Sequence, residues 1–365
     1  MDQIIGAGRH DILITEEPGS RISDFLSKKN YSSVVVIADE NTRRYCLPVL
    51  ESSLPSDFHL ITIGAGEKSK NSSTCQEVWE HLLRFNADRD SVIVNLGGGM
   101  VSDLGGFAAS TYKRGVRFIN IPTSLMGMVD ASLGGKTGID LNHYKNMVGT
   151  FAFPELVLIA PVFLNTLPAN EWKNGIAEII KHGLIADEEI WLSLRNDIVF
   201  SNSKDISTKI KDTVTSLLDK AIRVKAILVS SDPFEKNERM FLNFGHTTGH
   251  AFETLSLVND EKYLSHGEAI AMGIICEMFI SNELYGFPET QLREISIAIA
   301  KFYPYKKIAP GDFTKLLALM KSDKKSSEGK LKMVLLKDIG SPVIHHGISD
   351  DLISSSFRFY NTVLK

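Results

Sequence analysis

The chain has 365 residues, of which 43% are hydrophobic and 23% charged, and its 40 basic and 44 acidic residues give a formal net charge of −4. This even balance of charges argues against a nucleic-acid-binding protein, because contacts to a phosphate backbone require clustered Lys and Arg. Cys46, Cys75 and Cys276 are too few and too far apart for a disulfide framework or a thiolate zinc site, and no apolar run approaches the roughly 18 residues of a membrane span, so we expect a cytoplasmic protein without a membrane partner.

Five short runs in the first half are rich in Val and Ile and are bounded by Gly, Asp or Pro, as buried strands are. They cover residues 34–38, 60–63, 92–96, 118–121 and 156–159. Helical patterns lie between them, for example over residues 72–85, where Val78, Leu82 and Phe85 form one apolar stripe. This alternation predicts a parallel, Rossmann-like sheet with helices on both faces, in which ligands bind at the carboxyl ends of the strands.

The pattern changes after Pro168. Residues 170–302 show long helical periodicity, with one helix predicted over residues 204–230, and a strand-like run follows at residues 332–336. We therefore predict two domains, an α/β domain over residues 1–166 and a mainly helical domain over residues 167–365.

The first motif that suggests chemistry is Leu96-Gly-Gly-Gly-Met-Val-Ser-Asp103, directly after a predicted strand. Glycines let backbone N–H groups approach a phosphate, and the N-terminus of a following helix attracts anions. Because Ser102 replaces the third glycine of the usual dinucleotide fingerprint, the motif indicates a pyrophosphate more strongly than NAD, and a tight strand-to-helix turn is the alternative. Asp39 ends another strand and suits ribose hydroxyls, while residues 66–70 offer acids and cations.

A second group of residues resembles part of a phosphate-binding loop. Residues 134–137, Gly-Gly-Lys-Thr, look like the tail of a P-loop, but Asp130 stands where the leading Gly is required, so we do not expect a nucleoside triphosphatase. The hydroxyls, amides and cations nearby still suit an anion site: Thr123, Ser124, Lys136, Lys145 and Asn146.

The metal candidates are three histidines and one glutamate. His246 and His250 stand at i and i+4, so they share a helix face and can both bind zinc. Thr247 occupies the position of the glutamate base of a metalloprotease, which argues against that class. A lone His is more often a core or capping residue than a ligand. With His266 and with Glu178 on an apolar helical pattern, however, three protein ligands can leave one position open for substrate, as a catalytic zinc site requires.

Several cations complete the set. Arg114, Lys225 and Arg239 each resemble ordinary surface charges and gain interest only if the fold brings them to the groups above. Composition alone makes the lysine-rich segment 321–332 a solvated loop.

Taken together, these motifs resemble the 3-dehydroquinate synthase family. The likeness lies in residues 97–149, 178–181 and 239–250, and the motif order agrees from Asp39 to Lys325. It implies an α/β NAD-binding domain followed by a helical metal-binding domain, commonly in a homodimer. It also implies a lyase of aromatic amino acid biosynthesis (the shikimate pathway), which converts 3-deoxy-D-arabino-heptulosonate 7-phosphate to 3-dehydroquinate and phosphate. NAD would act catalytically, taking a hydride and returning it, with zinc or cobalt as the metal.

By position, the resemblance implies three sets of residues. The metal ligands are Glu178, His246 and His266. The NAD contacts are Asp39, Asn41, Glu67, Lys70, Gly98, Gly99, Met100, Asp103, Thr123, Ser124, Lys145, Phe163, Leu164, Asn165 and Thr166. The residues that bind the sugar phosphate or handle protons are Arg114, Asp130, Lys136, Asn146, Lys181, Lys225, Glu235, Arg239, Asn243, His250 and one of Lys324 and Lys325. The chain departs from the family at Ser124, Ala131 and Asp140, where Thr, Ser and Asn are usual.

Three alternatives stay open. A sister sugar-phosphate cyclase, acting on a substrate without a carboxylate, would share the NAD and metal motifs, although Arg239 beside Asn243 favours a carboxylated substrate. A metal-dependent polyol dehydrogenase would release free NADH, whereas a cyclase releases phosphate without net NADH. A non-catalytic module of the same fold is disfavoured, because every expected ligand and cation is present.

Overall fold

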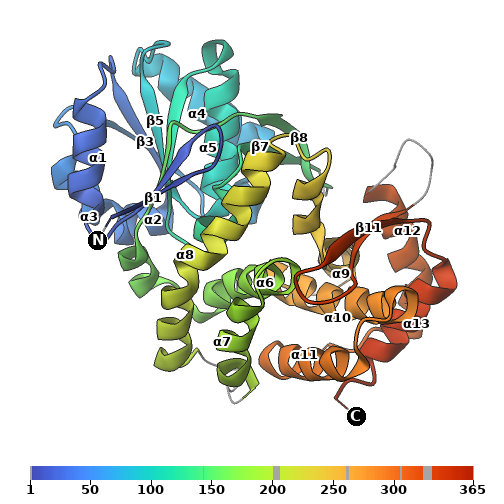
Figure 1. Cartoon of the computed structure of the whole chain (residues 1–365). Coiled ribbons are helices and arrows are strands. Elements are labelled where there is room, and N and C mark those ends of the chain that lie inside the picture. Colours follow the sequence, from blue (N-terminus) through green and yellow to red (C-terminus); the bar gives the residue numbers. More distant parts are fainter. Residues whose placement is uncertain are drawn as a thin grey trace. The chain divides into compact units, whose positions relative to one another are not determined.

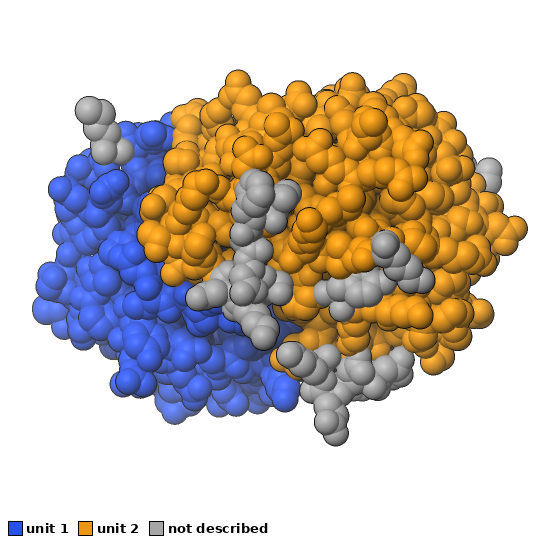
Figure 2. Space-filling view, turned by 90° about the horizontal axis from the view of Figure 1, so that it is seen from below, with its two compact units in different colours: residues 1–171, 225–234 blue, residues 172–224, 235–365 orange. Residues whose placement is uncertain are grey.

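The computed structural model describes residues 2–142, 144–199, 206–259, 263–304, 306–323 and 331–364. The chain divides into two compact units, coloured separately in Figure 2. Unit 1 comprises residues 1–171 and 225–234, and unit 2 comprises residues 172–224 and 235–365. We predicted a single boundary after residue 166. The observed division differs, because the first unit extends to residue 171 and also includes residues 225–234, which contain the last turns of a long helix. Lys324 and Lys325 lie outside the described residues.

A seven-stranded sheet, in the order β1-β2-β9-β6-β5-β3-β4, forms the centre of unit 1. Its neighbouring strands are parallel except for β1 and β2. The strands are β1 Gln3–Gly6, β2 Asp11–Ile14, β3 Val34–Asp39, β4 His59–Ile63, β5 Val92–Gly97, β6 Arg117–Pro122 and β9 Leu156–Ile159. All of β3 and β5 is buried, as expected for central strands covered on both faces. The predicted parallel sheet is confirmed, whereas the short strands β1 and β2 were not predicted.

Helices cover both faces of this sheet. Figure 1 shows α1 on one side and α4 and α5 on the other. Their bounds are α1 Pro18–Ser27, α2 Glu40–Tyr45, α3 Leu47–Leu50, α4 Ser72–Arg84 and α5 Gly99–Thr111. Short 3-10 or π-helical segments are η1 Glu51–Ser53, η2 Glu67–Ser69, η3 Tyr112–Arg114, η4 Gly127–Ala131 and η5 Pro161–Thr166. The helix predicted over residues 72–85 is α4, which begins where the Asn71 side chain accepts the N–H of Thr74 at 3.0 Å.

Helix α5 is packed on two sides, which explains why most of its residues are apolar. One side contacts β5 and β6, and the other contacts the hairpin of β7 (Lys136–Leu141) and β8 (Tyr144–Phe151). A Cβ atom at Gly105 would lie 1.9 Å from Asn95 Oδ1, and one at Gly106 would lie 2.5 Å from Thr137 Cγ2. The two glycines therefore allow both contacts. The residues that resemble the tail of a P-loop lead into this hairpin, with Lys136 as the first residue of β7.

Unit 2 is mainly helical, as predicted. Its helices, two of which begin or end in unit 1, are α6 Ala169–Ile185, α7 Glu188–Val199, α8 Thr208–Ser231, α9 His246–Asn259, α10 His266–Tyr285, α11 Glu289–Phe302, α12 Phe313–Asp323 and α13 Asp350–Tyr360, with turns η6 Glu238–Asn243 and η7 Pro310–Asp312. The predicted strand at residues 332–336 is β10 Lys332–Leu336, which pairs antiparallel with β11 Pro342–His346. The buried helix α10 lies at the centre and contacts α9, α11, α13 and β10. Within the described parts of the chain, none of these helices combines the length and apolarity of a membrane span.

Candidate active site

Three side chains from three helices of unit 2 meet at one point. Glu178 lies in the middle of α6, while His246 and His266 are the first residues of α9 and α10. Glu178 Oε1 lies 3.1 Å from His266 Nε2 and 3.5 Å from His246 Nε2, and one ligand atom of each residue lies within 4.8 Å of the others. Glu178 is fully buried and His246 is 8% exposed. The predicted metal ligands therefore converge, although they come from distant parts of the sequence.

Glycines bring these helices together at backbone distance. A Cβ atom at Gly267, beside His266, would lie 2.6 Å from the Cα atom of Asn174 on α6. A Cβ atom at Gly249 would lie 3.0 Å from the carbonyl oxygen of Ala269, which links α9 to α10. Because no side chain separates the helices at these points, the N-termini of α9 and α10 lie close to the middle of α6.

The cluster combines one anionic and several basic groups. Lys181, 1% exposed and one turn after Glu178, donates to Glu178 Oε2. Burial raises the pKa of Glu178, but Lys181 and His246 lower it more, so that it lies well below the usual value. Burial and the Lys181 ammonium lower the pKa of His246 to about 4. Burial also lowers the pKa of His266, but hydrogen bonding to Glu178 and Glu253 raises it to about 10.

The second ring nitrogen of each histidine also faces an oxygen atom. His246 Nδ1 lies 3.1 Å from the carbonyl oxygen of Phe244, and His266 Nδ1 lies 3.7 Å from Glu253 Oε2. Such contacts direct Nε2 of a metal-binding histidine toward its ion. His250 lies next to both ligands, with its ring centroid 5.3 Å from that of His246. The donor set of two imidazoles and one carboxylate fits a zinc ion with a fourth position for substrate.

The polar residues before α9 form a second group in unit 2. Arg239 on η6 is 1% exposed, so its guanidinium is an interior group and not a surface charge. Asn243, at the end of the same turn, donates through Nδ2 to Glu235 Oε1 at 2.9 Å. Glu235 has φ +56, in the left-handed region. The structure thus brings together two of the predicted substrate residues, Glu235 and Asn243, and places a buried cation on the turn that Asn243 ends.

In unit 1 the glycine motif forms a tight turn between β5 and α5, with Gly98 as the N-terminal cap of α5. A Cβ atom at Gly98 would lie 3.1 Å from Ser124 Oγ, and one at Gly99 would lie 2.8 Å from Ala131 Cβ. Ser102 Oγ, in the first turns of α5, is buried without a hydrogen-bond partner among the residues that the structure describes. The turn therefore offers free N–H groups at a helix N-terminus, glycines that let the backbone lie close to a ligand, and an unpaired hydroxyl. These features fit the pyrophosphate of a dinucleotide.

Asp39 occupies the end of β3, the edge where a dinucleotide ribose would bind. Its Oδ1 accepts the N–H groups of Asn41 at 2.8 Å and Thr42 at 2.9 Å, and so caps α2. The predicted ribose acceptor therefore also has a local structural role. The segment η5 is also expected to contact NAD. In it, Phe163 and Leu164 are buried, whereas Asn165 and Thr166 are exposed.

Buried Lys70 lies in a cluster with four other predicted residues. Lys70, 4% exposed, donates to Asp103 Oδ2 at 2.6 Å and to Asn146 Oδ1 at 2.5 Å. Glu67 Oε1 lies 4.0 Å from Lys70 Nζ and 3.3 Å from Lys145 Nζ. Burial lowers the pKa of Lys70, but Asp103 and Glu67 raise it above the usual value, so this lysine stays charged. Asn146, interpreted from the sequence as a substrate contact, thus joins residues expected to bind NAD.

Other predicted substrate residues of unit 1 are more scattered. Lys225, on the last turns of α8, donates to the main-chain oxygen of Asp130 at 2.6 Å and to Asp130 Oδ1 at 2.5 Å. Arg114 lies exposed on η3 with φ +69, and Lys136 lies exposed at the first position of β7. The structure therefore joins Asp130 with Lys225 and leaves Arg114 and Lys136 on the surface of unit 1.

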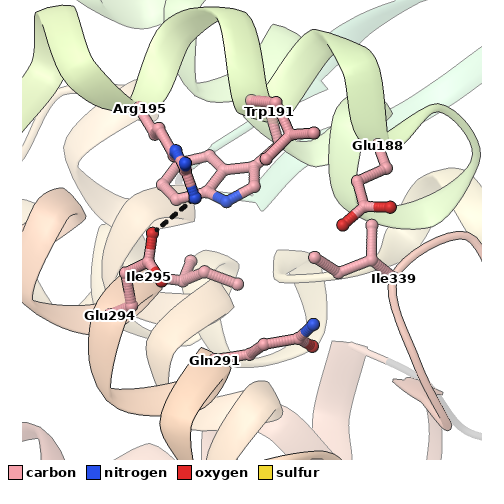
Figure 3. Close-up of a pocket in the computed structure, with 8 residues that line it drawn as sticks. Glu188, Trp191, Arg195, Gln291, Glu294, Ile295 and Ile339 are labelled. Carbon is pink, nitrogen blue, oxygen red and sulfur yellow. Dashed lines mark hydrogen bonds and ion pairs between the residues drawn. The ribbon is translucent and has the colours of Figure 1, made fainter.

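A small hollow lies between α7 and α11 (Figure 3). It has a volume of about 60 Å³, and Arg195 pairs with Glu294 there at 3.0 Å. None of the residues singled out in the sequence lines it. A volume of this size suits a few water molecules and is far below the roughly 300 Å³ of a small ligand pocket.

Comparisons with known proteins identify the family of this chain. The family model for the N-terminal part of 3-dehydroquinate synthase matches residues 60–174, and the model for the C-terminal part matches residues 175–326. The 3-dehydroquinate synthase of Parabacteroides distasonis is 40% identical over 96% of this chain and 97% of its own length. That of Staphylococcus carnosus is 34% identical over 98% of each chain.

Solved structures show the same fold. The chain is similar to 2-deoxy-scyllo-inosose synthase, in complex with carbaglucose-6-phosphate, NAD+ and Co2+, with a TM-score of 0.81, 23% identity and coverage of 98% of this chain and 99% of the other. It is similar to ValA, the 2-epi-5-epi-valiolone synthase of Streptomyces hygroscopicus with bound NAD+ and Zn2+, with a TM-score of 0.80, 25% identity and coverage of 96% of each. Glycerol dehydrogenase of Schizosaccharomyces pombe has a TM-score of 0.62 at 15% identity, covering 96% of this chain and 89% of the other.

Proposed function

This chain belongs to the 3-dehydroquinate synthase family, and from that premise we propose which of its residues carry out the reaction. Its activity is that of a phosphate-eliminating lyase, which converts 3-deoxy-D-arabino-heptulosonate 7-phosphate to 3-dehydroquinate and phosphate. The overall conversion involves no net oxidation, so NAD leaves the cycle unchanged. When bound, a divalent metal ion supplies a Lewis acid for the substrate hydroxyls and NAD supplies a reversible hydride acceptor.

A metal ion would be held by Glu178, His246 and His266. This assignment rests on the single observation that one donor atom of each lies within 4.8 Å of the others. Lys181 holds the remaining carboxylate oxygen of Glu178, so that Oε1 is directed toward the histidines. Zinc is the expected ion, and cobalt fits the same donor set.

NAD is held by unit 1. The N–H groups of Gly98, Gly99 and Met100 at the start of α5 would hold its pyrophosphate, where the helix dipole favours an anion. Asp39, which caps α2 through Oδ1, would accept a ribose hydroxyl. Lys70 fixes Asp103 beside this turn.

The substrate carboxylate is bound by Arg239. A planar, permanently charged guanidinium can bind a carboxylate through two parallel hydrogen bonds. Arg239 is only 1% exposed, which limits competition from water. The phosphate contacts that the family resemblance implies (Arg114, Lys136, Asn146 and His250) stay predictions, as do the homodimer and the cytoplasmic location.

The decisive experiment incubates the protein with the heptulosonate phosphate, NAD and zinc while phosphate, ring product and NADH are measured together. We expect phosphate and 3-dehydroquinate in equal amounts and no accumulation of NADH. NADH accumulation with a simple polyol, and no phosphate release, would instead identify a polyol dehydrogenase. Turnover of a sugar phosphate without a carboxylate, but not of the heptulosonate, would identify a sister cyclase.

A further inference from the structure

A buried carboxylate on α10 binds the segment that carries His246. Glu277 has no exposed surface, and it is an acidic residue within the otherwise apolar stretch of α10 from Ala269 to Ile280. Its Oε2 accepts the N–H of Gly245 at 2.7 Å, and its Oε1 accepts the N–H of Thr248 at 3.0 Å. These N–H groups lie at the N-terminus of α9, whose dipole stabilises a negative charge at this position.

One of the two bonds leads directly to the ring of His246. The N–H of Gly245 and the carbonyl of Phe244 belong to the same peptide group, and that carbonyl oxygen lies 3.1 Å from His246 Nδ1. A carbonyl oxygen can only accept, so Nδ1 carries the hydrogen in this contact. The unprotonated nitrogen is then Nε2, the atom that faces Glu178.

We infer that Glu277 is a positioning residue for the metal site, acting on His246 through the 244–245 peptide group. A carboxylate bonded to the N–H of a peptide polarises that peptide and makes its carbonyl a stronger acceptor. The stronger acceptor holds the Nδ1–H tautomer of His246 and makes Nε2 a better donor to a cation. The arrangement corresponds to a carboxylate–histidine–metal triad with a peptide group inserted between carboxylate and ring.

We call the hydrogen-bonded path from Glu277 through the 244–245 peptide group to His246 the relay. The local packing requires glycine at position 245 of this relay. Gly245 has φ +77, and a Cβ atom there would lie 2.6 Å from Ile274 Cγ1 on α10. Position 245 therefore brings its N–H close to α10, where Glu277 accepts it. The imidazole, the peptide and the carboxylate are all buried, so water competes little for these bonds.

The test compares Glu277→Gln with a matched control on the same helix. Ser281 is also fully buried on α10, and its Oγ accepts the N–H of Leu336 at 2.9 Å. Its Oγ also donates to the main-chain oxygen of Glu277 at 2.7 Å, so Ser281→Ala removes two buried hydrogen bonds but leaves the Glu277 carboxylate, the 244–245 peptide and His246 unchanged. For each variant and the wild type, zinc affinity is measured by chelator competition, and the absorption spectrum of bound Co2+ reports the ligand geometry.

We expect Glu277→Gln to weaken zinc binding by about tenfold to hundredfold and to shift the Co2+ spectrum. Ser281→Ala should leave both unchanged even where it lowers stability. The inference is overturned if zinc affinity of Glu277→Gln stays within twofold of wild type, or if both variants lose it equally.

A measurement on the wild type covers the case in which Glu277→Gln does not fold. Zinc binding should move the NMR signal of the Gly245 amide proton further downfield than that of Thr248, because the first lies within the relay and the second shares only the carboxylate. Equal shifts would overturn the inference. The relay rests on the proposed metal site, and the two fail differently: if Glu178→Gln binds zinc as tightly as wild type, the site itself is wrong.

Discussion

A Cβ atom on Gly273 would lie 1.9 Å from the carbonyl oxygen of Gly245. Helices α9 and α10 thus touch backbone to backbone, at the point where the chain turns into α9 and His246 begins it. Both the position of His246 and the reach of Glu277 to the Gly245 N–H depend on this contact.

The substitution Gly273→Ala tests this contact. A methyl group at 1.9 Å from a carbonyl oxygen forces the helices apart, which overpacks the core at a cost of about 1–3 kcal/mol, so we expect a lower free energy of unfolding together with weaker zinc binding. Urea unfolding and chelator competition measure the two effects. Gly311→Ala is the control, because a Cβ atom there meets no atom within 4 Å. A fully stable Gly273→Ala with wild-type zinc affinity would contradict the role of close packing.

Zinc retention tests the assignment of Glu178. In Glu178→Gln the only carboxylate of the three proposed ligands becomes a neutral amide, so we expect loss of bound zinc after dialysis and loss of turnover. Zinc should raise the thermal unfolding midpoint of the wild type, because a ligand that binds only the folded state stabilises it, but not that of the variant. Retained zinc with full activity would show that Glu178 is not a ligand.

The pH dependence of zinc binding follows from the state of His266. Its pKa, raised to about 10, means that the metal-free protein carries a proton on this ring at pH 7. A metal must displace that proton, so zinc affinity should rise by about tenfold for each pH unit between 6 and 8. Calorimetry in buffers of different ionisation enthalpy should count about one proton released per zinc at pH 7. An affinity independent of pH would indicate a neutral His266.

The ion pair of buried Lys70 with Asp103, whose side chain is 19% exposed, should matter for the stability of unit 1. Lys70→Met leaves the largely buried carboxylate of Asp103 without this cation; because breaking a fully buried pair costs about 3–5 kcal/mol, we expect a smaller loss of unfolding free energy here. Lys70→Met with Asp103→Asn should recover part of that loss, because the remaining charge is removed as well. Urea unfolding measures both. If the loss of unfolding free energy in the double variant equals or exceeds the sum of the losses in Lys70→Met and Asp103→Asn, the residues do not act as a pair.

The sequence predicted those features of the fold that depend on local pattern. The apolar runs at β3, β5 and β6 are long enough to stand out, and His246 and His250 share a helix face by spacing alone. The hairpin of β7 and β8 was not predicted, because the sequence showed only that residues 134–137 resemble the tail of a P-loop. It is tertiary packing against α5 that makes this segment a hairpin.

Glu253 and Glu277 were not recognised as part of the site, for a related reason. A single acidic residue on a helix usually faces solvent, whereas tertiary packing of α9 and α10 buries these two. For Glu277 a signal existed, because it interrupts the apolar stretch of α10. The partner of Asn146 could not be predicted either, since its contact with Lys70 joins positions 76 residues apart.

The buried guanidinium of Arg239 provides the test of substrate class. If Arg239 binds the substrate carboxylate, Arg239→Lys keeps the charge but loses the bidentate geometry, and Arg239→Ala loses both. A charged hydrogen bond contributes about 1.5–3 kcal/mol, so kcat/KM for the heptulosonate should fall by about tenfold to hundredfold in Arg239→Lys and further in Arg239→Ala. Zinc and NAD affinities, measured in the same variants, should stay at the wild-type level, which separates lost substrate binding from general unfolding. Equal kcat/KM values in wild type and Arg239→Ala would remove the reason for preferring a carboxylated substrate over that of a sister cyclase.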